Sequence, residues 1–382
     1  MEMPKVLDTD DFIAFAGGTG RDIWAVATAA RDGDLHALGA LLDAQPDLVH
    51  CGHYSWLPRD CYRPLHFAVH ANQLAAVEFL LSRGAHVLDE FLLNSINQSL
   101  TIARTSGYES VYAALDADRR RRFAYHPEAA TVAKAIRAKD FQAVYSLLDG
   151  DRTLLDATDE TGNAPIHWSI LTCQLELLRI LAERGANLNH VRFDGQRPID
   201  LVEGDYWFNH QKYGGAKEVQ VPGVLIGFLL GLGADYGLCV AIRLGDEVRV
   251  RALLDSDPAL ANQLSNDPSG PSTAGDHGRR RPIVEAAKYG RLEIARVLIK
   301  AGADVNLGVP LWSPNGHALF EACARGEVAM ARLLLQAGAR ANVEVESSGD
   351  CFSIMKRNEP DIVGALQALL TEYGGIAVNY DE

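Results

Sequence analysis

The segment 64–88, PLHFAVHANQLAAVEFLLSRGAHVL, decides the architecture of this chain because variants of it recur along the sequence. Near copies are PIHWSILTCQLELLRILAERGANLN from Pro165, PIVEAAKYGRLEIARVLIKAGADVN from Pro282 and ALFEACARGEVAMARLLLQAGARAN from Ala318. In each copy, apolar residues fall at helical spacing on both sides of a short break, and a Gly-Ala pair follows. Each copy therefore predicts a short helix, a tight break, a second helix and a turn.

The residue at the break between the two helices, here called the break residue, aligns the copies. It is expected at Gly33, Asn72, Gly107, Lys139, Cys173, Gly245, Gly290, Gly326 and Asn358. Glycine and asparagine suit the left-handed turn that ends a helix, whereas Lys139 and Cys173 do not, so we expect those two copies to depend on their neighbours. The long interval from Cys173 to Gly245 predicts a degenerate copy, with DGQRPIDLV as hairpin and first helix and VLIGFLLGLGAD as second helix.

This pattern resembles the ankyrin repeat, a unit of about 33 residues that opens with a TPLHxA motif. The resemblance covers nearly the whole chain and implies an all-α solenoid of about ten stacked helix-turn-helix repeats, several of them degenerate, with β-hairpin or loop fingers. It implies that His66 and His167, at the histidine of the motif, tie the hairpin backbone together. It also implies a function in binding other proteins.

The expected organisation has five parts. These are an N-terminal leader or cap at 1–19, about three repeats at 20–118, a basic break or linker at 119–130, about seven repeats at 131–375 with insertions at 204–220 and 263–281, and an acidic tail at 376–382. The arginine run 119–122 has two interpretations, a short linker or a solvated helix end with its cations near the C-terminal dipole, and the second is favoured.

The composition of the chain disfavours several classes of binding partner and cellular compartment. With 36 basic and 50 acidic residues, the net charge of −14 disfavours nonspecific binding to nucleic acid. No apolar run is long enough to span a bilayer, and the acidic start MEMPKVLDTDDF lacks a signal-peptide pattern. Six cysteines without paired short spacing argue against a disulfide framework. We therefore expect a cytoplasmic protein without a nucleic-acid or membrane partner. The protein partner is what the resemblance implies, and no cofactor is expected.

The resemblance implies that a ligand would meet a concave groove made by the hairpin tips and by exposed positions of the first helices. The two residues before each break residue, here called the edge residues, should face this groove. The earlier edge residues are Arg31, His70, Thr105, Arg137, Leu171, Arg243, Lys288 and Ala324, and the later ones include Asp32, Tyr289 and Arg325. Cations recur at the earlier position, which favours an anionic ligand such as an acidic peptide, a terminal carboxylate or a phosphate. The alternative is that these side chains only solubilise the face or pair with nearby acids.

Enlarged hairpins supply further candidates. The segments 50–63, 204–220 and 307–316 contribute the binding candidates Tyr54, Trp56, Arg59, Tyr206, Trp207 and Trp312, to which Trp168 of the motif is added. Aromatic side chains beside charged ones are typical of recognition surfaces. The alternative is that each insertion folds back over the stack and buries its own aromatic residues.

An enzyme would need a titratable pair in a pocket. The residues available for acid–base chemistry are His53, Asp60, His70, Asp194, His210, Lys212 and Tyr213. No Gly-rich phosphate loop, GxSxG elbow or HExxH motif is present, and the spacing of Cys51, His53 and Cys61 matches no common zinc site, so no metal is expected. The leading hypothesis is a scaffold that binds a partner protein. The alternatives are a receptor for an anionic or sugar-like small molecule, or a hydrolase or lyase, with a pocket formed by 50–63 and 204–220.

Overall fold

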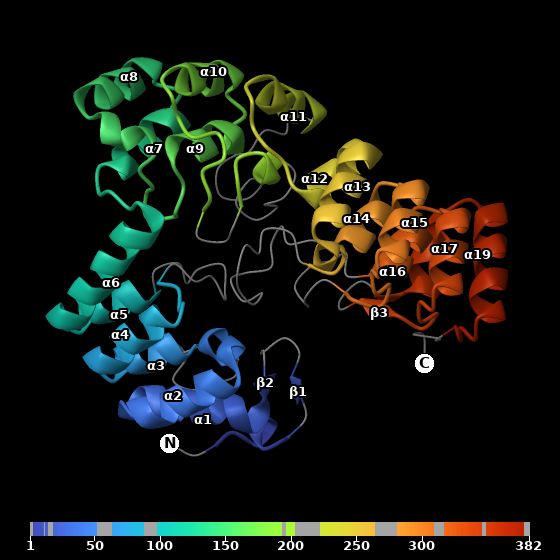
Figure 1. Ribbon diagram of the computed structural model, residues 1–382, viewed down its shortest axis with the longest axis horizontal. Helices are drawn as coiled ribbons and strands as arrows, with labels where there is room; N and C mark the ends of the chain where they lie inside the picture. The colour runs from blue at the N-terminus through green and yellow to red at the C-terminus, as the bar shows by residue number, and fades with distance from the viewer. Residues whose placement is uncertain are drawn as a thin grey trace. The chain divides into compact units, whose positions relative to one another are not determined.

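The computed structural model is built almost entirely from short paired helices (Figure 1). It describes residues 3–10, 12–13, 18–51, 63–87, 98–192, 196–202, 222–263, 281–308, 317–345 and 349–377. The chain forms two compact units, of which the N-terminal unit ends at Ala234 and the C-terminal unit begins at Asp235. Helix pairs recur in both units, and this confirms the predicted all-α repeat fold.

The N-terminal unit opens with three helix pairs. They are α1 (Gly20–Asp32) with α2 (Leu35–Ala44), α3 (Pro64–His70) with α4 (Leu74–Ser82), and α5 (Gln98–Thr105) with α6 (Glu109–Phe123). The 3₁₀ turns η1 (Lys5–Leu7) and η2 (Pro46–His50) and the antiparallel strands β1 (Phe12–Ile13) and β2 (Gly18–Thr19) flank the first pair. Leu7 is fully buried in the same hydrophobic cluster as Ile23 of α1, so the segment before α1 contributes to the core of the first repeat.

The same unit continues with α7 (Ala129–Arg137), α8 (Phe141–Gly150), η3 (Arg152–Leu155), α9 (Pro165–Leu171), α10 (Leu175–Glu183), η4 (Asp200–Val202) and α11 (Pro222–Gly231). The degenerate repeat has its second helix, α11, where the sequence predicts it. Its expected first helix is only the turn η4 within the described residues 196–202. The Asp200 carboxylate accepts a hydrogen bond from the backbone N–H of Arg197 at 3.0 Å, which closes this turn locally.

The C-terminal unit contains the most regular repeats. They comprise α12 (Leu238–Leu244), α13 (Glu247–Ser256), η6 (Pro258–Ala261), α14 (Pro282–Lys288), α15 (Leu292–Lys300), α16 (Ala318–Ala324), α17 (Val328–Gln336), the antiparallel strands β3 (Glu344–Val345) and β4 (Gly349–Asp350), α18 (Cys351–Ile354), η7 (Met355–Arg357) and α19 (Pro360–Glu372). Proline at the first position of α14 and of α19 costs no hydrogen bond, because that N–H has no partner within a helix.

The arginine run 119–122 lies inside α6, which continues to Phe123. Asp116 forms ion pairs with Arg119 at 2.5 Å and Arg120 at 2.6 Å, and Asp118 pairs with Arg121 at 2.9 Å and Arg122 at 2.6 Å. All four pairs join residues three or four apart, the spacing at which side chains on a helix meet. The described helices on both sides of 119–130 belong to the N-terminal unit, and the division between compact units falls after Ala234.

The predicted left-handed backbone is present at eight of the break residues. Gly33, Asn72, Gly107, Lys139, Cys173, Gly245, Gly290 and Gly326 have φ angles between 53° and 76°. The prediction is wrong at Asn358, whose φ is −89°. The Asn358 side-chain amide instead donates hydrogen bonds to the carbonyl oxygens of Cys323 at 2.8 Å and Met355 at 2.9 Å. Asn358 therefore caps the ends of two helices without reversing the chain.

Similar caps recur between neighbouring repeats. The Gln174 side-chain amide donates to the carbonyl of Ile136 at 2.8 Å, and the Arg291 guanidinium donates to the carbonyl of Arg243 at 2.7 Å. Each donor directly follows a break residue and adds a hydrogen bond at the C-terminal end of the preceding first helix, where few carbonyls have a partner within the helix. A Cβ at the break residue Gly245 would lie 3.2 Å from the Arg291 guanidinium carbon, so this glycine also leaves room for the cap.

An asparagine ladder joins the turns that follow the second helices of the C-terminal unit. The Asn262 amide donates to the carbonyl of Gly302 at 2.8 Å and accepts from the N–H of Asp304 at 2.7 Å. Asn306 makes the same two contacts with Gly338 and Arg340, and Asn342 makes them with Gly374 and Ile376. In each case the asparagine amide both donates a hydrogen bond to the next turn and accepts one from it, which holds the two turns together.

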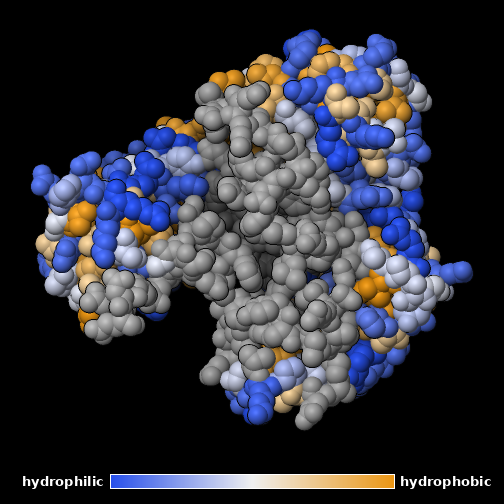
Figure 2. Space-filling view, turned by 180° about the vertical axis from the view of Figure 1, so that it is seen from behind, coloured by the Kyte–Doolittle hydropathy of each residue, from blue (hydrophilic) through white to orange (hydrophobic). Residues whose placement is uncertain are grey.

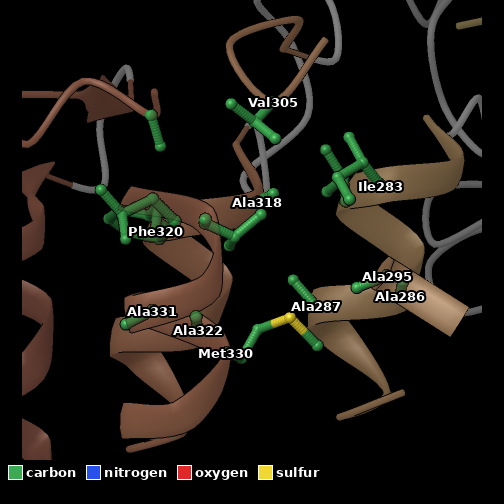
Figure 3. Packing of buried hydrophobic residues seen from close by; sticks show 14 of the residues in the cluster. Ile283, Ala286, Ala287, Ala295, Val305, Ala318, Phe320, Ala322, Met330 and Ala331 are labelled. Carbon is green, nitrogen blue, oxygen red and sulfur yellow. The ribbon is translucent and has the colours of Figure 1, made fainter. Parts of the chain in front are cut away.

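Small side chains allow the helices of the C-terminal unit to pack closely. Ala287 of α14, Ala322 of α16 and Ala331 of α17 are fully buried, and Met330 of α17 extends toward Ala287 (Figure 3). The flexible thioether of methionine fills the space that the alanines leave. Because each repeat buries its apolar face on the next, the core is a continuous layer.

The described surface is mostly hydrophilic, as expected when the apolar faces of the repeats are buried against one another. On the face shown in Figure 2, hydrophilic residues cover most of the described surface, and hydrophobic residues lie among them in small groups. No helix among the described residues is long and apolar enough to cross a membrane.

The motif histidines are buried near the start of the first helices. His167 accepts a hydrogen bond at Nδ1 from the backbone N–H of Ala164 at 3.1 Å, and its Nε2 lies 3.0 Å from the carbonyl oxygen of His190. His66 occupies the equivalent position of α3 and is 3% exposed. Burial, reinforced by the Arg63 cation, lowers the pKa of His66 to about 3. His66 is therefore neutral at physiological pH.

Acid is expected to destabilise the fold through His66. Its pKa is about 3 in the folded protein and 6.5 as an ordinary histidine, so below pH 6.5 the unfolded chain binds a proton that the folded state does not. Stability is full above that value and falls toward pH 3, by roughly 2 kcal/mol between pH 7 and pH 5. Urea unfolding at both pH values measures this loss. His66→Gln should remove it, whereas His70→Gln, at an exposed position of the same helix, should retain it. An equal pH dependence in both variants would contradict the assignment.

Candidate functional site

The first helices of the C-terminal unit are buried except at their C-terminal ends. Every residue of α14 from Pro282 to Ala287 is buried, and only Lys288 is partly exposed. In α16 the residues from Ala318 to Cys323 are likewise buried, and Arg325, just beyond the helix, is exposed. The side chains that these helices offer to a ligand are therefore their edge residues.

An edge residue of one repeat packs against the fourth residue of the next first helix. The Arg137 guanidinium carbon lies 5.0 Å from the ring centroid of Trp168, the fourth residue of α9. Arg243 forms an ion pair with Glu285, the fourth residue of α14, at 3.2 Å. The same pair of positions in neighbouring repeats therefore forms a cation–π contact in the N-terminal unit and an ion pair in the C-terminal unit.

Trp168 is a core residue, and its predicted place on a binding face is corrected accordingly. It is 1% exposed, and its indole Nε1 donates a hydrogen bond to Oδ2 of Asp159 at 2.7 Å. The other Asp159 oxygen accepts from the N–H of Thr161 at 2.8 Å and of Asn163 at 3.1 Å. Burial raises the pKa of Asp159, while these hydrogen bonds oppose the rise. The tryptophan and the aspartate hold the hairpin before α9 on its helix.

Arg243 was also predicted to face a ligand, and this is corrected too, because its side chain is only 6% exposed. The side chain of its partner Glu285 is only 1% exposed. A charge in such surroundings is stable when it is paired and hydrogen-bonded, and Glu285 supplies both interactions. The cation is therefore committed to the contact between repeats. The sequence argument missed this because the partner acid lies in a different repeat.

The structure brings Lys288 and Tyr289 together with Arg243. The Lys288 Nζ and the Arg243 guanidinium carbon each lie 5.8 Å from the ring centroid of Tyr289. Lys288 and Tyr289 are both partly exposed, unlike Arg243. Lys288 and Tyr289 are therefore the accessible members of this group, and the Arg243–Glu285 ion pair is its buried part.

The edge residues of the N-terminal unit are more varied. Arg31 pairs with its own neighbour Asp32 at 2.7 Å, so its charge is compensated locally. His70 is exposed, and Arg137 is exposed while it covers Trp168. The Thr105 hydroxyl donates to the carbonyl of Thr101 within its own helix at 2.8 Å. The predicted row of cations is therefore interrupted in this unit.

Sequence reasoning missed two exposed cations, Lys356 and Arg357. They lie in the turn η7 that follows α18, and both are exposed. Their place just after the short helix of the last repeat is the signal that could have identified them. Arg325, already recognised as an edge residue, is an exposed cation at the end of the first helix one repeat earlier. Within the described ranges, none of these three side chains forms an ion pair or a hydrogen bond.

Most of the remaining candidates lie outside the described residues. These are His53, Tyr54, Trp56, Arg59, Asp60, Asp194, Tyr206, Trp207, His210, Lys212, Tyr213 and Trp312. Of the residues considered for acid–base chemistry, the described part of the chain contains His70. In that part, no three His, Cys, Asp or Glu side chains are placed so that they could hold a metal ion.

Comparison with known proteins agrees with the repeat geometry. A family model described as ankyrin repeat matches residues 61–90 and 280–308, one segment in each compact unit. The crystal structure of the human ASB11 ankyrin repeat domain is similar at 17% sequence identity, covering 65% of this chain and 99% of that chain, with a TM-score of 0.32. The comparison with curated proteins finds no match. The two matched segments are thus similar to ankyrin repeats, which generally mediate protein–protein interactions, and the same paired helices and left-handed break residues recur along the described chain.

The buried ion pair generates a stability prediction. Glu285→Gln removes the negative charge and leaves the Arg243 cation buried, so we expect a loss of about 3 kcal/mol in the free energy of unfolding. Glu293→Gln, which removes the acid of the exposed pair with Arg296, should change stability little because water screens that pair. Urea unfolding of both variants compares them. A loss for Glu285→Gln no larger than that for Glu293→Gln would show that the pair does not hold the repeats together.

Proposed function

We propose that this protein is a binding scaffold that recognises an acidic or extended segment of a partner protein. In this proposal, the contact surface consists of the exposed edge residues and the enlarged hairpins. The observation that carries it is the exposure pattern of the C-terminal unit. The first helices are buried along their length, while Lys288, Tyr289 and Arg325 remain accessible at their ends.

The chemistry of these ends favours an acidic partner. An overall charge of −14 repels acidic molecules at long range, so a local row of cations is the feature that could select one. Lys288 supplies a compact charge, and Arg325 supplies a planar fork that can hold a carboxylate through two parallel hydrogen bonds. Tyr289 adds apolar area at low cost in side-chain entropy.

Partner capture tests this function. The full chain is immobilised and exposed to lysate from its own host at low salt, and bound proteins are identified by mass spectrometry. We expect a partner that is lost with Lys288→Glu combined with Tyr289→Ala, and that binds more weakly as salt rises. Lys300→Glu is the matched control, because Lys300 is an exposed cation at the end of a second helix. Equal capture by the edge variant and the control would place the binding surface elsewhere.

A further inference from the structure

Two cysteines of neighbouring repeats meet in the core of the C-terminal unit. Cys323 is the sixth residue of α16, and Cys351 is the first residue of α18. We propose that this pair is an oxidative modification site, at which a peroxide converts the two thiols into a reversible disulfide that links the last two repeats. This modification does not depend on a partner protein.

The two sulfur atoms are already in contact. The thiols of Cys323 and Cys351 are hydrogen-bonded to each other, and both residues are fully buried. Helices α16 and α18 pack on one another, and both cysteines belong to the hydrophobic cluster of this unit. A disulfide bond is about 2 Å long, so the hydrogen-bonded sulfurs have only a short gap to close. Rotation of the two side chains supplies this movement without a change in the packing of the helices.

Further contacts hold the backbone on both sides of the pair. The side-chain amide of Asn358 donates a hydrogen bond to the carbonyl oxygen of Cys323 at 2.8 Å. At the start of α18, the N–H of Ser353 donates to Oδ1 of Asp350 at 2.7 Å, and the N–H of Asp350 donates to the Ser353 hydroxyl at 2.9 Å. Because the helix ends that carry the two cysteines are fixed in this way, the thiols stay in contact while the fold is closed.

The surroundings of the pair make oxidation slow in the closed fold. The hydrogen bond to Cys323 and burial raise the pKa of the Cys351 thiol, and the charge of Asp350 acts in the same direction. The thiolate is the form that attacks a peroxide, so little of the reactive form of Cys351 is present. A disulfide carries no charge, and an apolar site therefore accepts it more readily than it accepts a thiolate.

The last repeat supplies the opening that the reaction needs. Within the described residues, α18 and α19 pack on the repeat before them, and no helix pair follows them. A repeat with one neighbour buries less apolar surface than a repeat between two, so it opens more easily. We therefore expect the pair to react during brief openings of this repeat, when water and peroxide reach both sulfurs.

The reaction balances with one hydrogen peroxide for each disulfide. One cysteine, as its thiolate, attacks a peroxide oxygen, the O–O bond breaks, and a sulfenic acid forms while the other oxygen leaves as water with the proton that the thiol lost. The second thiol then attacks the sulfenic sulfur, the S–O bond breaks, and a second water leaves. Each cysteine sulfur is oxidised by one electron, and the peroxide is reduced by two. Exchange with an added dithiol reverses the link.

The disulfide restrains the opened state of the last repeat. It closes the chain between Cys323 and Cys351, which contains α17 and the strands β3 and β4. A closed loop has fewer conformations when it unfolds, so opening becomes less favourable. Cys323 also lies two residues before Arg325, so the link tethers the helix end that carries this edge residue.

Disulfide mapping of the full-length protein tests the site. The folded protein is treated briefly with N-ethylmaleimide to block partly exposed thiols such as Cys173, then with hydrogen peroxide in the absence of denaturant, and it is digested without reductant. Mass spectrometry should identify two peptides joined through Cys323 and Cys351, and dithiothreitol should separate them. Recovery of both cysteines as thiols or as sulfinic acids, or of either one joined to a different cysteine, would show that the proposed modification is wrong.

Hydrogen exchange tests the effect of the link. Amides of α18 and α19 should exchange at least about tenfold more slowly in the oxidised protein than in the reduced protein, with α12 and α13 unchanged. Cys351→Ala should abolish this difference. Cys239→Ala, at another buried cysteine of the same unit, is the matched control and should retain it. Equal exchange in the oxidised and reduced wild-type protein would contradict a link that restrains the last repeat.

Discussion

The structure depends on how the C-terminal end of each first helix is closed. A seven-residue helix such as α14 has few internal hydrogen bonds and would not be stable alone in water. The left-handed break residue turns the chain at this end, and a side chain from the following repeat can donate a further hydrogen bond to a carbonyl there, as Gln174 does to Ile136 and Arg291 does to Arg243. In these repeats the neighbour therefore helps to close the helix of its predecessor, and stability is shared between neighbours.

This closure also determines which side chains remain for function. Most residues of the first helices are buried by packing, and in α9 and α14 the fourth residue contacts the edge residue of the preceding repeat, as Glu285 pairs with Arg243. What remains accessible is a narrow row at the helix ends. In the C-terminal unit this row includes Lys288, Tyr289 and Arg325, so the same geometry that stabilises the stack leaves cations accessible at the helix ends.

The sequence predicted the repeat order well because helical periodicity and the left-handed positions are local properties. Even Lys139 and Cys173, which are unusual at such positions, adopt φ angles of 58° and 53°. The errors concern contacts between repeats. Trp168 and Arg243 were expected at the surface, but Trp168 is covered by Arg137 of the preceding repeat and bonded to Asp159 of its own hairpin, and Arg243 is paired with Glu285 of the next repeat. Asn358 has the right residue type for a break, but its amide bonds to Cys323, and this interaction with a distant residue is invisible in the local pattern.

Hydrogen exchange of a single variant tests most directly whether repeats stabilise one another through these caps. Gln174→Ala removes the hydrogen bond to the Ile136 carbonyl and leaves both helix pairs otherwise intact. The account predicts faster amide exchange in α7 to α10, the two repeats that share this cap, with exchange in α1 to α4 unchanged. A uniform increase across all these helices, or no increase at α7, would contradict stabilisation by the neighbouring repeat.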